Sequence, residues 1–447
     1  MNNFMQALNK RLTPVAEFCA TERHLASMQK GFMTMIGFIM VSAIFVIAAN
    51  PPVTADMIAA GGFWSIFKPW FDFAAANKMT ILIPYNMTMG MLSLIGNFSI
   101  AYNLSASYED NDLEPMMTAL ISVIMFLLAA APYTYYELAD GTYAGMLSGT
   151  YLGAQGLFTS IIVALASVEI TRFAKKHLHI RFNAAVPEGI AKTFNSIFPI
   201  AMNIVVWFGG NLILGAIHQG WTIPVFIETM LGAPLTGLIN STAGTFIICL
   251  LVLLFWCFGI HGNMIVMSFT TPVTMLAFAN NAALMAAGKA PVMEPILVMN
   301  AINLLGGTGN PLSFLLLCIT NAKSERLKAE GKAMIVPAVF RISEPVIFGI
   351  PIAYNPVLFI PFILSGLVPA ILYYICGRLG LVTPMWLLVS GTFPIFINSY
   401  IKCLDWRMIV FELVMIPVTA LIWYPFFKVY DNNCLKEEAA TAQEKIS

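Results

Sequence analysis

The sequence predicts an all-α polytopic membrane protein with about ten transmembrane helices, re-entrant hairpins and interfacial amphipathic helices. Of its 447 residues, 59% are hydrophobic and only 10% are charged, whereas soluble domains carry about 25% charged residues. The mean hydropathy is +0.79. The apolar residues form long continuous runs, such as Phe32–Ala49, Phe246–Ile260 and Leu358–Cys376. Outer-membrane barrels show alternation in place of such runs, so the sequence excludes that class.

The first half of the chain has a regular pattern of apolar segments. We expect five spans here, at residues 32–49, 80–104, 115–137, 143–171 and 194–218. The segment Gly220–Ile239 is shorter and contains two prolines, which is typical of an interfacial connector. Residues 1–240 are therefore predicted to form an N-terminal scaffold half.

The second half, residues 241–430, is less regular. Glycine or proline accompanies polar side chains inside apolar surroundings at Gly259–Asn263, Leu305–Leu312 and Ser343–Pro356. Interrupted hydrophobic segments are the best sequence indication of a transporter's binding site. We therefore expect this half to handle a solute and residues 431–447 to form a polar cytoplasmic tail.

Charge indicates orientation and excludes some classes of function. Lys plus Arg and Asp plus Glu each number 23, so the balanced charge excludes a nucleic-acid partner. Basic residues gather in the stretches Lys10–Lys30, Arg172–Arg181 and Lys323–Lys332. The positive-inside rule places all three stretches, and with an even number of spans both termini, in the cytoplasm. The seven cysteines show no CxxC spacing, so we expect buried packing residues, with no metal, disulfide framework or cofactor.

Glu344 is the leading candidate for a functional residue. It lies in R-I-S-E-P-V-I-F-G-I-P, where proline and glycine forbid a long uninterrupted helix. Ser343, Glu344 and Pro345 also form a good helix start, so the acid could simply cap backbone donors. The functional interpretation is a carboxylate that accepts hydrogen bonds from a hydroxylated solute, because a buried acid is costly unless something bonds it.

A second candidate motif is W-C-F-G-I-H-G-N, which contains Trp256, His261 and Asn263. An imidazole can donate from one nitrogen and accept at the other, so His261 could orient a hydroxyl. Trp256 offers a flat apolar face suited to a sugar ring. The alternatives are a core histidine with satisfied hydrogen bonds and a packing or interfacial tryptophan.

The glycine-rich run Gly306–Pro311 could be mistaken for a phosphate loop. It lacks the lysine–serine ending of a P-loop, and no strand is evident before it. We therefore predict a turn at the tip of a broken helix. Another cluster, Tyr133, Tyr135, Tyr136 and Tyr143, is predicted to belong to an aromatic belt at one membrane interface.

Several of these motifs together resemble one known family. The runs I-S-E-P-V-I-F-G-I-P-I-A-Y-N-P-V-L-F-I-P, W-C-F-G-I-H-G, L-G-G-T-G and V-P-E-G-I-A-K-T-F-N-S-I-F-P are similar to motifs of membrane IIC subunits. These subunits belong to the lactose/cellobiose/diacetylchitobiose family of the bacterial phosphoenolpyruvate-dependent sugar phosphotransferase system.

The resemblance implies a ten-span homodimer in the bacterial cytoplasmic membrane. Residues 1–240 would provide the dimerisation scaffold, and residues 241–430 would carry a β-linked disaccharide between re-entrant hairpins. Glu344 and His261 would bond the hydroxyl that becomes phosphorylated, Trp256 would flank the ring, and Ser343 and Asn263 would complete the site. The phosphoryl group would come from the phosphocysteine of a separate IIB protein, itself supplied by IIA.

Two positions depart from the family pattern. Ser343 stands where the family usually has asparagine, so one sugar contact would differ. The late Pro-Trp-Thr-type motif is not evident in Leu387–Ser399, where Phe393 or Phe396 could replace an aromatic wall. These departures affect the choice of disaccharide more than the mechanism.

Two other functions remain open from the sequence. In an ion-coupled secondary sugar transporter, Glu344 and His261 would form a proton relay. A polytopic enzyme acting on lipid would place several polar catalytic groups at an interface, whereas this chain has one acid and one histidine in separate motifs.

Overall fold

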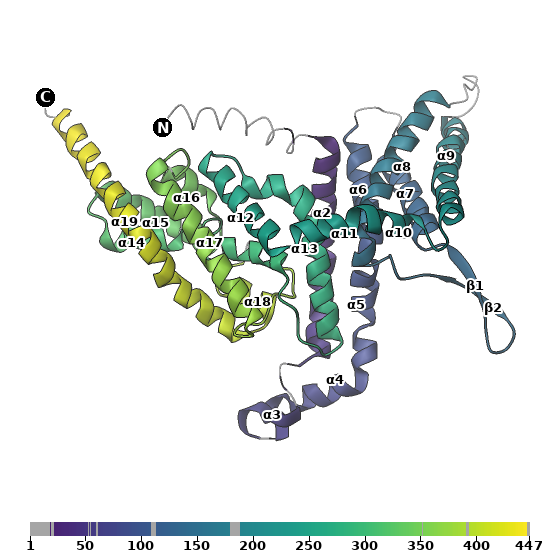
Figure 1. Cartoon of the computed structure of the whole chain (residues 1–447), viewed down its shortest axis with the longest axis horizontal. Coiled ribbons are helices and arrows are strands. Elements are labelled where there is room, and N and C mark those ends of the chain that lie inside the picture. The colour runs from purple at the N-terminus through teal and green to yellow at the C-terminus, as the bar shows by residue number, and fades with distance from the viewer. Residues whose placement is uncertain are drawn as a thin grey trace. The chain divides into compact units, whose positions relative to one another are not determined.

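The computed structural model describes residues 18, 22–51, 53, 55–59, 61–108, 113–178, 188–350, 352–389 and 393–444. Pro351 and parts of the first two basic stretches lie outside these ranges. The described chain is helical apart from one two-stranded sheet (Figure 1). Within it, seven helices are long and apolar enough to cross a membrane, or eight if one bent pair counts as a single span. The all-α polytopic fold class is thus confirmed, while the number of ten spans stays a prediction.

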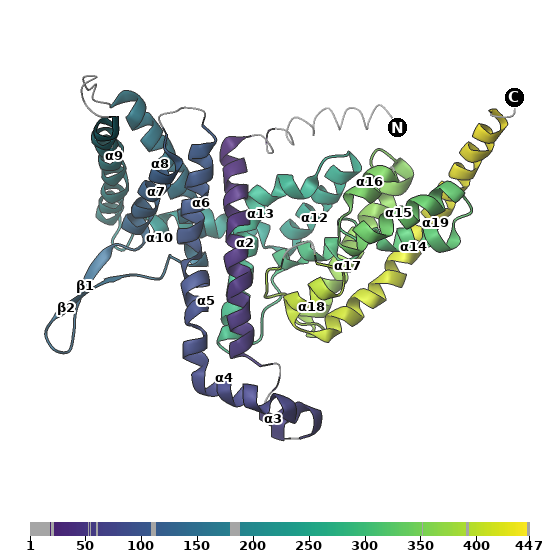
Figure 2. The same cartoon turned by 180° about the vertical axis from the view of Figure 1, so that it is seen from behind.

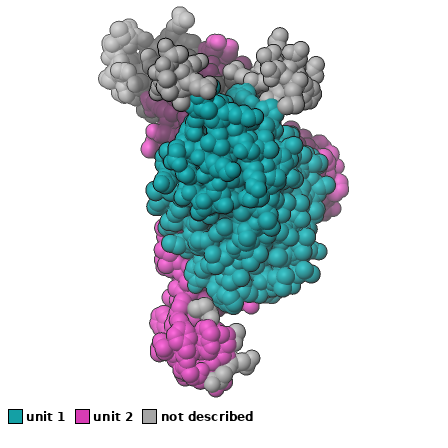
Figure 3. All heavy atoms as spheres, turned by 90° about the vertical axis from the view of Figure 1, so that its left-hand side faces the viewer, with its two compact units in different colours: residues 1–18, 238–285, 289–447 teal, residues 19–237, 286–288 magenta. Residues whose placement is uncertain are grey.

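The chain forms two compact units, which Figure 3 shows in different colours. The N-terminal unit consists of residues 19–237 and 286–288, and the C-terminal unit of residues 238–285 and 289–447 with Phe18. In the N-terminal unit the elements are α2 (Arg23–Ala49), α3 (Ala55–Ala59), η1 (Gly62–Phe67), α4 (Lys68–Ile81), α5 (Ile83–Thr88), η2 (Met89–Met91), α6 (Leu92–Ala106), α7 (Pro115–Ala130), β1 (Tyr133–Glu137), β2 (Tyr143–Leu147), η3 (Ala154–Gly156), α8 (Leu157–His177), α9 (Glu188–Ile217), α10 (Ile223–Ile227), η4 (Glu228–Gly232) and α11 (Ala233–Ile239).

Small and polar residues hold the helices of the N-terminal unit together. Helix α6 packs against α2, α7 and α8. A side chain at Gly31 of α2 would place its Cβ only 2.4 Å from Ile100 of α6, so glycine permits this close approach. Asn97 of α6 donates to the Ser160 carbonyl of α8 at 3.0 Å and accepts from Ser122 of α7 at 2.8 Å. Such small residues and interhelical hydrogen bonds are what association in lipid requires.

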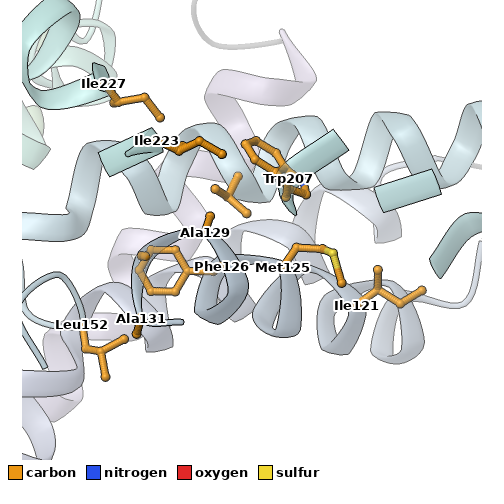
Figure 4. Close-up of a cluster of buried hydrophobic side chains, with 11 residues drawn as sticks. Ile121, Met125, Phe126, Ala129, Ala131, Leu152, Trp207, Ile223 and Ile227 are labelled. Carbon is orange, nitrogen blue, oxygen red and sulfur yellow. The ribbon is translucent and has the colours of Figure 1, made fainter. Parts of the chain in front are cut away.

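An apolar cluster joins α7 to α8, α9 and α10 in the same unit (Figure 4). Phe126 and Met125 of α7 lie at its centre, and Trp207 of α9 reaches it with 6% of its surface exposed. The indole nitrogen of Trp207 donates to Ser167 of α8 at 2.9 Å, so its polar edge is also satisfied.

Two predicted span boundaries in this unit are wrong. Helix α7 ends at Ala130 rather than at residue 137, and α8 begins at Leu157 rather than at residue 143. Between them β1 and β2 form an antiparallel hairpin with Tyr133 opposite Leu147. The Asp140–Gly141 dipeptide lies between the two predicted spans, and between aromatic residues it is a hairpin signal.

The C-terminal unit is built from helices with short interruptions. Its elements are α12 (Thr242–Cys257), α13 (Gly262–Ala286), η5 (Pro295–Asn303), α14 (Leu312–Asn321), α15 (Glu325–Val339), α16 (Glu344–Gly349), α17 (Pro356–Arg378), α18 (Ile397–Cys403) and α19 (Trp406–Glu444). Helix α17 packs against η5 and against α12 and α19, which are labelled in Figure 2. Three interruptions matter for the site: those between α12 and α13, between η5 and α14, and between α15 and α16.

The last part of α19 caps the start of α15. Asp431, with 4% of its surface exposed, accepts hydrogen bonds from the Lys323 and Ser324 backbone N–H groups at 2.9 Å. Glu438, about two helical turns further along α19, accepts a hydrogen bond from Ser324 Oγ at 2.6 Å. The predicted polar tail therefore continues α19 as helix through Glu444.

Candidate functional site

One cavity brings the three interruptions of the C-terminal unit together. Its volume is about 170 Å³, below the roughly 300–1,000 Å³ of pockets that bury a drug-sized ligand. A disaccharide would therefore extend beyond it in this conformation. The cavity is lined by Trp256, His261, Asn263, Asn303, Gly307, Thr308, Arg341, Ser343 and Glu344.

Glu344 and His261 face each other across this cavity. His261 Nε2 lies 3.4 Å from Glu344 Oε1, and the two side chains are 38% and 45% exposed. His261 Nδ1 accepts from the Met264 backbone N–H at 3.3 Å, and the tautomer that satisfies this bond carries its ring proton on Nε2. The 3.4 Å separation is longer than the usual hydrogen bond, so a solute hydroxyl could compete for both groups.

The carboxyl of Glu344 is held in its charged form. It lies outside the candidate spans, in the first turn of α16. The neighbouring imidazole of His261, helped by backbone N–H groups at this helix start, lowers the pKa of Glu344 against the opposing effect of burial. Ser343 occupies the N-cap position of α16 without making a side-chain cap bond. Glu344 thus faces the cavity. A purely capping acid would instead be enclosed by the backbone N–H groups that it caps.

Trp256 packs against the His261 ring, and its own ring is buried. The two ring centroids are 4.4 Å apart, and Trp256 has only 1% of its surface exposed. Its Nε1 atom makes no hydrogen bond within the described residues. In this conformation Trp256 orients the imidazole and offers a solute little of its face.

The glycine-rich turn supplies the opposite side of the cavity. It joins η5 to α14, as the sequence predicts for the tip of a broken helix. Gly307 has φ +92°, and a Cβ there would meet the Ser343 Cβ at 2.8 Å. Glycine therefore lets the turn lie directly against the α15–α16 interruption. Thr308, the next residue, accepts a hydrogen bond from Asn263 Nδ2 at 2.9 Å.

Asn310 fixes this turn in place. It is fully buried and has φ +52°, a conformation that asparagine tolerates better than most residues. Its amide donates to the Ser365 carbonyl of α17 at 2.8 Å, and its oxygen accepts from the Leu305 N–H at 2.8 Å. Asn310 thus ties the turn to α17 and satisfies the Leu305 N–H from within the chain.

All five residues singled out from the sequence line the cavity, but the sequence missed four others. Gly307 and Thr308 lie in a run interpreted only as a turn. Arg341 and Asn303 carried no recognised motif, although an arginine three residues before the acid in an apolar segment was a usable signal. Phe393 and Phe396, considered as a replacement aromatic wall, are not among the lining residues.

Comparison with known proteins decides the family. The model of the "Phosphotransferase system, EIIC" family matches residues 29–366. The chain belongs to this EIIC family. It is 29% identical to the cellobiose-specific EIIC component of Geobacillus stearothermophilus, covering 98% of this chain and 97% of that one. It is also 29% identical to the lactose-specific EIICB component of Lacticaseibacillus casei, where the match covers 98% of this chain and 73% of the relative.

A solved structure shows the same fold. The EIIC chain matches the transporter ChbC, the IIC component of an N,N'-diacetylchitobiose-specific phosphotransferase system, with a TM-score of 0.83 and 28% identity. The match covers 97% of this chain and 99% of ChbC. The resemblance drawn from the sequence motifs is therefore confirmed at the level of family and fold.

The cavity offers a defined set of interactions to a solute. Glu344 is a charged acceptor, His261 Nε2 is a donor beside it, and the Asn263–Thr308 pair provides further polar atoms. Asn303 Oδ1 is buried and makes no hydrogen bond within the described chain. Buried polar atoms normally have partners, so a polyhydroxylated ligand would complete this arrangement.

Proposed function

We propose that this EIIC protein binds a β-linked disaccharide of the cellobiose, diacetylchitobiose or lactose type at Glu344 and carries it inward for phosphorylation by a phosphorylated IIB protein. The observation that supports this proposal best is the convergence of three helix interruptions on one cavity containing Glu344 and His261. The names of the relatives agree with this substrate class.

The mechanism follows from the chemistry of the cavity. Glu344 accepts a hydrogen bond from the sugar hydroxyl that becomes phosphorylated, and a charge-assisted bond of this kind is stronger than a neutral one. His261 Nε2–H donates to the same oxygen and fixes its orientation. In the transfer step the S–P bond of the IIB phosphocysteine breaks and the sugar O–P bond forms. The hydroxyl proton passes to Glu344 or to water, and positioning supplies most of the rate.

The proposal also includes the orientation of the protein in the membrane and its oligomeric state. The protein would lie in the cytoplasmic membrane with both termini inside and would work as a homodimer through residues 1–240. The basic stretch Lys323–Lys332 contains four cations and two carboxylates, so it keeps a net positive charge that would attract phosphorylated IIB, although two of the cations have acidic partners. Arg326 bonds Glu330 at 2.8 Å, and Lys328 bonds Glu325 at 2.7 Å.

Proton-coupled transport is the second candidate function. The 3.4 Å approach of His261 and Glu344 is the observation that favours it, because adjacent titratable groups can relay a proton. In that case uptake would need the proton gradient and would deliver unmodified sugar.

Uptake by sealed vesicles containing the purified protein distinguishes the two functions. We expect a labelled β-linked disaccharide to accumulate only when phosphorylated IIB is supplied on the cytoplasmic side, and to be recovered as a sugar phosphate. Uptake should survive an uncoupler that collapses the proton gradient. Recovery of unmodified sugar, driven by the gradient without IIB, would refute group translocation.

A further inference from the structure

Arg341 has no assigned part in the function proposed above, yet it lines the same cavity. It lies in the interruption between α15 and α16, three residues before Glu344. Its backbone adopts φ +63°, which is uncommon for a residue with a long side chain. Conformations of this kind persist only where the surroundings fix them, and they gather at functional sites.

The guanidinium of Arg341 is held by neutral oxygen atoms. Its Nε donates to the Asn303 carbonyl at 2.9 Å, and its Nη1 donates to Asn398 Oδ1. Nη2 makes no hydrogen bond to the residues that the structure describes. Two hydrogen bonds therefore fix the orientation of the guanidinium. Its Nη2 atom stays available to a ligand in the cavity.

The charge of Arg341 is also not neutralised by direct contact. Among the described residues, no carboxylate comes within the 4.0 Å ion-pair distance of its guanidinium. Glu412 interacts with Arg341 electrostatically, but its oxygen atoms accept from the Phe396 N–H at 2.7 Å and from Ser399 Oγ. A guanidinium keeps its proton in proteins, so the cavity wall carries a permanent positive charge.

A neutral disaccharide does not require such a group. Burying a cation is costly unless an anion or several acceptors offset the lost hydration. Planar guanidinium matches carboxylate and phosphate oxygens, which can accept two parallel hydrogen bonds. We propose that Arg341 forms an anion subsite in the sugar cavity, which takes an oxyanion on the substrate. This inference depends on the proposed sugar-binding function.

Two sources could supply that oxyanion. One is a carboxylate on the sugar, as in a glucuronosyl disaccharide. The other is the phosphoryl group on the hydroxyl that Glu344 orients, whose charge an arginine would stabilise during transfer. The alternative to both is that Arg341 only joins the α15–α16 interruption to α18 and η5.

Calorimetric titration of the full-length protein in detergent distinguishes these cases. The three probes are cellobiose, its 6′-phosphate and glucuronosyl-β-1,4-glucose. We expect wild-type protein to bind at least one anionic probe about tenfold more tightly than cellobiose, the ratio that a charge-assisted hydrogen bond provides. Arg341→Gln should remove that preference while cellobiose affinity changes little, and Arg341→Lys should retain part of it.

Arg407→Gln is the matched control. Arg407 also holds a loop, through Asp405 at 2.9 Å and the Gly380 carbonyl at 2.9 Å, but it does not line the cavity. Its loss should leave all three affinities unchanged. A preference for the glucuronosyl probe identifies the substrate carboxylate as the source, and a preference for the phosphate alone identifies the phosphoryl group.

Wild-type protein that binds cellobiose but prefers neither anionic probe would overturn the subsite without touching the proposed function. Equal losses for all probes in Arg341→Gln would likewise show a structural role only. If the wild-type protein bound none of the probes, the subsite would fail, and the proposed function would fail for sugars of the cellobiose type. The wild-type ratios decide the question even if the Arg341 variants do not fold.

Discussion

At the site, each of three side chains packs against or approaches the next. Trp256 packs against His261, and His261 in turn stands 3.4 Å from Glu344. Since Trp256 has 1% of its surface exposed, it offers a solute little contact, and its packing holds the imidazole. This differs from the ring-flanking role that the family resemblance implies, which stays a prediction for another conformation.

Replacing Trp256 tests this support. Trp256→Phe keeps most of the packing and removes an indole N–H without a partner in the described chain, so we expect little change in thermal stability. Trp256→Ala should cost about 3–5 kcal/mol of stability, because it empties a buried volume. Thermal unfolding of both variants in detergent measures the difference. A severe loss in the phenylalanine variant would show that the indole nitrogen has a hydrogen-bond partner.

How far single residues could be predicted depends on how local their signals are. Glu344, His261 and Asn263 stand out because each is polar inside an apolar run. Arg341 is also polar inside an apolar run, but its place in the cavity, like that of Asn303, depends on a turn that folds back through tertiary contacts. The bond from Arg341 Nε to the Asn303 carbonyl joins residues 38 positions apart, which no local pattern reveals.

At the scale of elements, the interruptions are ordered structures and not gaps. The turn between η5 and α14 is fixed by Asn310 and pressed against Ser343 through Gly307. Gly307 and Thr308 of this turn line the cavity. Strain introduced in the turn should therefore damage both stability and binding.

Gly307→Ala makes that argument testable. Its φ of +92° and the 2.8 Å approach to the Ser343 Cβ disfavour any side chain, so we expect a loss of about 1–3 kcal/mol and weaker sugar binding. Gly237→Ala is the control, because a Cβ there meets no atom within 4 Å. The melting temperatures of the two variants should differ clearly. Equal values would contradict the close packing of the turn.

The junction of α19 with α15 gives a second prediction at this scale. Asp431→Ala leaves the Lys323 and Ser324 N–H groups without their acceptor, and we expect a cost of about 1–3 kcal/mol. Hydrogen exchange should rise at the start of α15. Asp72→Ala removes a surface pair with Lys68 in which the aspartate is 56% exposed, so it should cost at most about 1 kcal/mol. Unchanged exchange in the Asp431 variant would refute the cap.

Elements were predictable where hydropathy alone decides them. The helices α2, α9 and α17 follow their apolar runs. The β1–β2 hairpin was missed because its two strands were assigned to the ends of the spans predicted at residues 115–137 and 143–171. The predicted aromatic belt at Tyr133, Tyr135 and Tyr136 thus corresponds to an exposed strand.

At the scale of the whole molecule, composition fixes the class and the motifs fix the family. An apolar, charge-poor chain with interrupted helices in residues 241–430 agrees with the match to ChbC over 97% of its length. Composition does not fix the number of spans, because short helices such as α7 and α14 fall below the length of a full crossing. The division into a scaffold half and a solute-handling half stays a proposal.

Titration of the purified protein with a β-linked disaccharide, compared with Glu344→Gln, tests the central claim most directly. The amide keeps the shape of the side chain but loses the charge, so affinity should fall by about ten- to a hundredfold with thermal stability unchanged. Glu325→Gln, at a carboxylate that is 82% exposed on α15, should bind as the wild type does. Wild-type affinity in Glu344→Gln would show that the cavity does not hold sugar through this carboxylate.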